Sequence, residues 1–100
     1  MQFSLHRTPK GRVAYVVDVQ ADLLSELRTR VVIPLLLEKD APEIPFKAFN
    51  PTCSIAGVNH VLMTQNLASV PVAELGPPVG SLASQRDPIV RAMDALLSGL

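Results

Sequence analysis

The sequence predicts a mainly β domain: a small β-barrel followed by one C-terminal α-helix. Short apolar or alternating runs, separated by turn residues, occupy most of the chain, as in antiparallel sheets. Only the last segment has the spacing of an amphipathic helix. The chain has 100 residues, of which 48% are hydrophobic, so one domain spanning residues 1–100 with a single core is expected. A folded monomer of this size typically exposes about 5,500 Å² of surface.

A β-hairpin is predicted at the start of the chain. Gln2–His6 alternates polar and apolar residues, and Arg12–Val19 has an apolar residue at every second position. Between them, Pro9 fixes one backbone angle and Gly11 permits an unusual one, which is typical of a turn.

The middle of the chain contains the most apolar run. Val31–Leu37 is apolar throughout and predicts a buried strand. Pro34 cannot donate a ladder hydrogen bond, so it is expected at a bulge or facing an unpaired edge. Ala21–Arg30 fits either a helical turn or a loop, and the proline-containing stretch Glu38–Pro51 predicts an irregular excursion.

Three further short strands are expected in the second half of the chain. They are Thr52–Ile55 and Val58–Met63, joined near Gly57, and then Ser69–Leu75, which Pro71 interrupts. A sheet with so many short apolar strands must curl to bury them, which favours a barrel.

The last segment predicts an α-helix. Asp87 is expected as its N-cap, Pro88 as its first residue and Gly99 as its C-terminal glycine. One face of this helix is apolar and is formed by Ile89, Val90, Met93, Leu96 and Leu97.

Charge and cysteine content exclude several classes of protein. Nine basic residues balance nine acidic ones, which argues against direct binding of nucleic acid. A single cysteine allows no internal disulfide, and with two distant histidines it forms no structural zinc set, so no metal or cofactor is expected. The run Val31–Leu37 is far too short to cross a bilayer, and the first fifteen residues show no signal core. The sequence therefore predicts a cytoplasmic protein with no membrane contact.

Candidate catalytic groups have competing interpretations. Cys53 with His60 as base is a conceivable nucleophilic pair, but a buried thiol and a strand histidine are the simpler interpretation, and His6 is treated likewise. Arg28, Thr29 and Arg30 suit phosphodiester cleavage, or form a solvated loop that pairs with the nearby Asp22 and Glu26. The residues favour an interaction module, with no catalytic residue, over an enzyme.

Several ordered segments together carry a resemblance to a known family. They are Met1–Phe3, Val17–Gln20 with Asp22, Arg30 with Val32–Leu35, Met63–Thr64, Ala68–Val72 and Gly99–Leu100. With this set, the chain resembles the CcdB family of toxins from toxin–antitoxin modules over its whole length, with one residue missing from the first hairpin.

The resemblance implies a fold, a mechanism and partners. The fold would be an SH3-like barrel with a C-terminal helix, shared by CcdB-like and MazF-like toxins. The chain would form a homodimer, poison DNA gyrase by binding its A subunit, and be neutralised by a small CcdA-like antitoxin whose C-terminal segment folds on binding. The basic cluster Arg7, Lys10 and Arg12, which otherwise reads as a solvated turn, is the expected surface for an acidic antitoxin peptide.

The gyrase-binding residues implied by the resemblance are Ser98, Gly99 and Leu100. The family tripeptide is Trp-Gly-Ile, so Ser98 stands where the family has a tryptophan that grips an arginine of gyrase. Trp is the best cation–π partner, and its loss from a binding hot spot costs about 2 kcal/mol or more. Two such losses in a dimer would weaken binding about 10³-fold if they add.

Two other functions remain open, and dimerisation has its own argument. The alternatives are a MazF-like endoribonuclease using Arg28, Thr29 and Arg30, and a non-toxic homologue that only binds antitoxin. The apolar run Val31–Leu37 and the apolar helix face form a large hydrophobic surface for so small a barrel. They predict either a self-complementary dimer interface or a single core that uses both.

Overall fold

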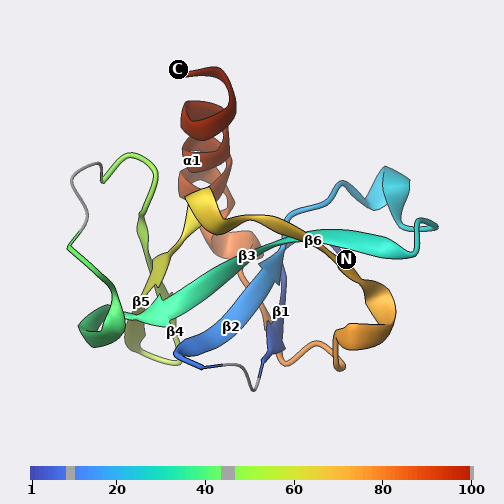
Figure 1. Ribbon diagram of the computed structural model, residues 1–100, viewed down its shortest axis with the longest axis horizontal. Helices are drawn as coiled ribbons and strands as arrows, with labels where there is room; N and C mark the ends of the chain where they lie inside the picture. Colours follow the sequence, from blue (N-terminus) through green and yellow to red (C-terminus); the bar gives the residue numbers. More distant parts are fainter. Residues whose placement is uncertain (9–10, 44–46, 100) are drawn as a thin grey trace.

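The fold was analysed in a computed structural model that describes residues 1–8, 11–43 and 47–99. Within these residues the chain forms a sheet of short strands and one C-terminal α-helix, α1 (Arg86–Ser98) (Figure 1). The strands, in chain order, are β1 (Ser4–Arg7), β2 (Val13–Asp18), β3 (Thr29–Leu37), β4 (Thr52–Ile55), β5 (Val58–Leu62), β6 (Ala68–Pro71) and β7 (Gly80–Ser81). Single 3₁₀ turns occur at Asp22–Leu24, Glu38–Asp40, Thr64–Asn66, Val72–Glu74 and Ala83–Gln85.

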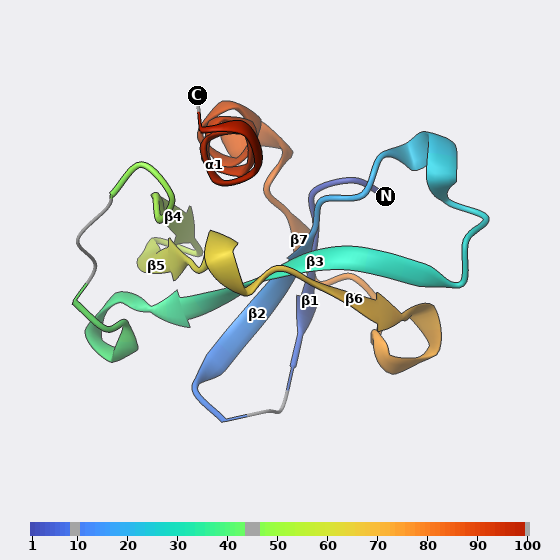
Figure 2. The same ribbon diagram turned by 45° about the horizontal axis from the view of Figure 1, so that its top comes forward.

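All the pairings in the sheet are antiparallel. The strand order is β4-β5-β3-β2-β1-β7, and β6 pairs separately with the first half of β3. The sheet curls into an open half-barrel, with α1 against one side of it (Figure 2), and β6 lies along one edge of β3. The predicted class, mainly β with a C-terminal helix, is confirmed.

Strand β3 is the centre of the sheet and explains the position of its proline. One edge of β3 pairs with β2, and the other pairs with β6 over Thr29–Val32 and with β5 over Leu35–Leu37. Pro34 lies where the partner changes, and its carbonyl accepts the Met63 N–H at 2.9 Å. Its missing N–H therefore faces the gap between β6 and β5, so the unpaired-edge alternative is confirmed.

One core fills the concave side of the sheet beneath α1. Strands β1 to β5 contribute to it, and in β3 the alternate residues Ile33 and Leu35 point inward, as the two-residue period of a strand requires. The buried cluster consists of Phe3, Leu5, Val17, Val19, Ile33, Leu35, Cys53, Leu62, Leu82, Ile89 and Ala92. The apolar strand and the apolar helix face thus meet in a single core, so the apolar surplus does not itself require a partner.

The helix starts earlier than expected and uses a narrower face. It begins at Arg86, after the Ala83–Gln85 turn, so the predictions that Asp87 is the N-cap and Pro88 the first residue are wrong. Asp87 instead lies in the first turn, where its charge complements the helix dipole. Gly99 ends the helix as predicted, with φ +74° and its N–H donating to the Ala95 carbonyl at 3.0 Å.

Leu97 does not belong to the buried helix face, contrary to the prediction. Its exposed fraction is 74%, whereas Ile89 and Ala92 are fully buried. The physical reason is the reach of the sheet. The first turns of α1 pack on the core, and the last turn extends beyond it (Figure 1).

The remaining strands match the predictions with small shifts. Strand β1 starts at Ser4 because Phe3 has φ +68°, which no strand residue adopts. The β4–β5 hairpin turns through Ala56 and Gly57, both with positive φ, the geometry of tight two-residue hairpins. Strand β6 ends at Pro71, so the predicted run to Leu75 is too long.

The side chain of Gln85 bridges the gap between two separate parts of the fold. Its amide accepts from the Ser54 N–H and donates to the Ser54 carbonyl, both at 2.9 Å. These are the bonds that a neighbouring strand would make. Gln85 therefore satisfies the free edge of β4 from the segment that leads into α1.

Thr64 carries the one buried side-chain oxygen without a hydrogen-bond partner among the described residues. It is fully buried in the Thr64–Asn66 turn, which contacts both β3 and α1. A hydroxyl desolvated without a partner opposes folding. Because the side chain is already buried within one chain, association with a second molecule cannot reach it without a local rearrangement.

We expect Thr64→Val to raise the free energy of unfolding by about 1 kcal/mol, because valine keeps the shape and removes the unpaired hydroxyl. For a domain of this size the midpoint of thermal unfolding should rise by roughly 4 to 8 °C. Thr64→Ser is the matched control: it keeps the hydroxyl, loses a methyl group and should be less stable than the original chain. A valine variant that melts lower would mean that the hydroxyl has a partner.

Candidate functional site

The helix tip is the first of the surfaces that the sequence singled out. The last turn of α1 leads through Ser98 to the left-handed Gly99, while Leu100 lies outside the described residues. The Ser98 hydroxyl donates to the Asp94 carbonyl one turn back, at 2.6 Å. Its hydrogen is therefore used inside the helix, and the apolar group that this turn exposes is Leu97.

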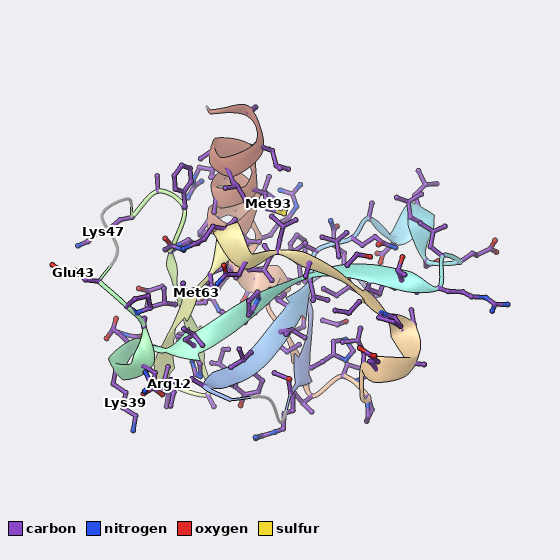
Figure 3. All side chains as sticks on the ribbon, in the orientation of Figure 1. Arg12, Lys39, Glu43, Lys47, Met63 and Met93 are labelled. Atoms are coloured by element: carbon purple, nitrogen blue, oxygen red, sulfur yellow. The ribbon has the colours of Figure 1, made fainter. Side chains whose placement is uncertain are left out.

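The basic cluster lies at the other end of the molecule. Arg7 ends β1 and Arg12 precedes β2, and both are exposed; Lys10 lies outside the described residues. Figure 3 shows Arg12 at the hairpin end, away from the tip of α1. The two predicted surfaces are therefore separate, which the sequence did not reveal.

Arg7 is not a freely solvated side chain, as the simplest interpretation of the cluster assumed. It is the direct cross-strand partner of Tyr15, and its Cζ atom lies 5.3 Å from the centroid of the Tyr15 ring. The ring of His60 meets Tyr15 edge to face, with centroids 5.4 Å apart and planes at 70°. Arginine, tyrosine and histidine thus form one stack across β1, β2 and β5.

Two hollows flank this stack. They have volumes of about 400 and 430 Å³, and both are lined by Arg7, Tyr15, Ile55 and Ala56. We call them together the Arg7 cleft. It lies between the β1–β2 hairpin, the β4–β5 hairpin and β7. Sequence reasoning named Arg7 but missed the cleft, because pairing Arg7 with Tyr15 requires the hairpin register.

A third hollow, of about 510 Å³, lies on the opposite face of the sheet. Its lining is mostly apolar and includes Val16, Val32, Pro34 and Val70, with Arg7 at its border. Arg7 thus stands where all three hollows meet.

Arg30 is fully engaged in holding the loop before β3. Its guanidinium donates to three backbone carbonyls, those of Ser25, Leu27 and Thr29. Its Nε atom lies 3.7 Å from the buried carboxylate of Asp18. The predicted partners of this loop, Asp22 and Glu26, do not pair with Arg30 in the described part of the chain. A salt bridge in this loop was expected and is present, but its acidic partner is Asp18 and not Asp22 or Glu26.

Arg28 and Thr29, the other members of that cluster, are exposed at the start of β3. Asp18 also accepts a hydrogen bond from the Gln20 N–H at 2.9 Å and lies 3.9 Å from the amino group of Met1. The arginines are therefore not focused on one concave point. Arg30 supports the backbone and Arg28 faces solvent.

Cys53 and His60 do not form an activated pair. They are cross-strand partners on β4 and β5, and both are buried. A histidine that activated the thiol would lower its pKa, but burial instead raises the pKa of Cys53 from 9.0 to about 11. His60 is bonded through Nδ1 to the Val58 carbonyl at 2.9 Å, and His6 through Nδ1 to Gly76 at 2.7 Å. All three side chains have structural contacts.

Among residues 1–8, 11–43 and 47–99, no group of three or more His, Cys, Asp or Glu side chains is arranged to hold a metal ion. In the same part of the chain, no helix has the length and apolar character needed to cross a bilayer.

Comparison with a known structure identifies the fold. The chain is similar to the Mycobacterium tuberculosis toxin MazF-mt6, with a TM-score of 0.69 and 19% sequence identity. The alignment covers 94% of this chain and 93% of that one. The half-barrel with a C-terminal helix is therefore a MazF-like toxin fold.

A family model gives the more specific assignment. The model for the CcdB protein matches residues 2–99, which is essentially the whole chain and includes the hairpin, β3 and the helix tip. The chain therefore belongs to the CcdB family, whose members are toxins of toxin–antitoxin systems.

Proposed function

We propose that this chain is a cytoplasmic toxin that acts by binding its target and is neutralised by a small antitoxin. Its target would be the A subunit of DNA gyrase, contacted by Ser98, Gly99 and Leu100. The main support for this proposal is the last turn of α1, which extends beyond the sheet and exposes 74% of Leu97. An apolar side chain held outward on a rigid helix end suits recognition of another protein.

A second exposed apolar group supports binding by contact. The loop before β3 presents Leu23, Leu24 and Leu27, with exposed fractions of 91%, 47% and 51%. The Arg30 hydrogen bonds fix this loop, so its leucines are held in place rather than free to collapse. A fixed apolar loop loses little entropy on binding, which favours affinity.

We propose that the working form is a homodimer, as is general in this family. The accessible surface of the chain is 6285 Å², larger than the roughly 5,500 Å² typical of a monomer of this mass. Dimerisation would cover part of that excess. A two-fold axis would also present two helix tips from one particle, and so double the contacts with a target.

The ribonuclease alternative is less well supported by the geometry. It needs Arg30 to reach a phosphate, yet this guanidinium is turned into the loop and bonded to three carbonyls and Asp18. Releasing it would leave the buried Asp18 carboxylate without its main cation, which is costly. The likeness to a MazF toxin is at 19% identity and supports the fold alone.

Expression of the chain in a gyrase-sensitive host should arrest growth, and co-expression of the small reading frame expected immediately upstream should restore it. The measurement is colony formation with and without induction. Healthy cells on induction, in a strain where the protein accumulates, would instead indicate a non-toxic homologue that only binds antitoxin. Deleting the codons for Gly99 and Leu100 should abolish the arrest.

Ser98→Trp should strengthen inhibition of gyrase supercoiling, because the indole supplies the apolar area and cation–π face that serine lacks. We expect the concentration for half inhibition to fall by at least about 10-fold, against a full difference of about 10³-fold for two tips. Asn59→Trp, which adds an indole to an exposed site on β5, is the matched control and should change nothing. The unchanged chain should inhibit gyrase weakly or not at all, so tight inhibition by it would contradict this prediction.

Incubation of the purified chain with RNA should leave the RNA intact, because Arg30 is a structural residue here. Arg30→Ala should lower the free energy of unfolding by about 2 to 4 kcal/mol, measured by urea denaturation. Arg28→Ala, at an exposed position, should leave stability unchanged. RNA cleavage by the original chain that disappears in a folded Arg28→Ala or Arg30→Ala variant would establish the ribonuclease instead.

A further inference from the structure

We propose that the Arg7 cleft is the docking site for an acidic segment of the antitoxin, with one carboxylate of that segment bound to the Arg7 guanidinium. This inference rests on the proposed toxin–antitoxin pairing and narrows it. Of the three basic residues of the hairpin, it makes Arg7 the recognition residue, with Tyr15 and His60 as its support.

The stacking geometry prepares Arg7 to bind a carboxylate. The Arg7 Cζ atom lies over the Tyr15 ring, 5.3 Å from its centroid, which is a cation–π contact. This contact uses no hydrogen-bond acceptor, so the guanidinium donors can form paired hydrogen bonds with a carboxylate. Arg7 forms no ion pair or hydrogen bond with another residue of the described ranges, in contrast to Arg30 and Arg86.

The platform beneath Arg7 is itself held in place. Tyr15 contacts both the Arg7 guanidinium and the His60 ring. His60 is 97% buried, given its exposed fraction of 3%, and is fixed by the bond from Nδ1 to the Val58 carbonyl. Each member of the stack therefore limits the rotation of the next. Arg7 is preorganised, so ligand binding loses little side-chain entropy at this residue.

The charge of the cleft specifies its occupant. Among the described residues that line the two hollows, Arg7 carries the only fixed charge, and no acidic side chain is present. The smaller hollow is mostly apolar, with Val13 and Leu37 in its wall, whereas the larger one is mostly polar and is lined by Ser54, Ser81, Ser84 and Gln85. A lone cation between an apolar wall and a wall of uncharged polar groups is complementary to a carboxylate in an acidic amphipathic peptide.

The size and position of the cleft favour a peptide segment over a folded domain. Hollows of about 400 and 430 Å³ admit a few side chains. The larger one lies between the edges of β4 and β7, where the Gln85 side chain bridges the gap to Ser54. The third hollow also borders Arg7 but is lined by Glu74, which would repel an acidic ligand.

The test measures binding of a synthetic peptide, the C-terminal half of the protein encoded immediately upstream, to the full chain by calorimetry. Arg7→Gln should raise the Kd at least about 10-fold at low salt, because a charge-assisted pair is lost. Arg91→Gln removes the same charge from an exposed helix position outside the cleft and should change the Kd less than about 2-fold. Tyr15→Phe should retain binding, whereas Tyr15→Leu should weaken it, because the ring face and not the hydroxyl supports Arg7.

A second arm identifies the carboxylate. Each Asp and Glu of the peptide is changed to its amide, and one of these changes should weaken binding as much as Arg7→Gln and add nothing further in the Arg7→Gln background. Unfolding curves confirm that each variant is folded. Equal losses for Arg7→Gln and Arg91→Gln, or no single coupled carboxylate, would overturn the docking site while leaving the toxin–antitoxin pairing intact. If neither the peptide nor the complete upstream protein binds the original chain, the pairing itself fails, and the docking site with it.

Discussion

The structure depends on one constraint: strand β3 is apolar on both faces and lies in the middle of the sheet, so both faces must be kept from water. The first turns of α1 cover one face, through Ile89 and Ala92. On the other face Val32 is buried and Pro34 is half-buried beneath the hollow of about 510 Å³, while β6 and β5 pair with the two halves of one edge of the strand. The change of partner along this edge, from β6 to β5, falls at Pro34 and leaves no N–H unpaired there, because proline has none. Curling of the sheet keeps this second face largely buried as well, since every residue of β3 except Thr29 is buried or half-buried.

Because the core needs only part of the helix and of the strands, other parts of the chain are available for recognition. A helix of 13 residues is about 20 Å long, and the core uses only its first part. The rest becomes a rigid projection that ends at Gly99. At the end of the molecule with the β1–β2 hairpin, the strands extend beyond the helix. There the side chains of Arg7, Tyr15 and His60 contact one another and are not covered by α1. The same core that stabilises the fold therefore creates two separate surfaces.

Local sequence signals predicted the elements but not the contacts between distant ones. The alternation in β2, the apolar run of β3 and the glycine that ends α1 each act within a few residues, and each was confirmed. The start of α1 and the end of β6 were misplaced locally, whereas the failures that affect the candidate surfaces involve partners far apart in the chain. Leu97 is exposed because the sheet ends before the last turn of α1. Arg30 forms its ion pair with Asp18, and not with Asp22, which is nearer in sequence, because the pairing of β2 with β3 places Asp18 beside it. The Arg7 cleft required the register of two hairpins, which no single segment encodes.

The separation of the two surfaces constrains any antitoxin that uses both. The molecule measures 36 × 30 × 23 Å, and the helix tip and the β1–β2 hairpin lie at opposite ends of it (Figure 1). An extended chain advances about 3.3 Å per residue, so roughly nine to eleven residues are needed to cross 30 to 36 Å. A compact antitoxin domain seated in the Arg7 cleft would leave the tip open to its target. An antitoxin segment that is unfolded when free can instead bind the cleft with one part and cover Leu97 with another, because a flexible chain follows the surface between them. Two weakly binding segments joined by a short linker then bind with high overall affinity. Once the first segment is bound, the second is present at a high effective concentration.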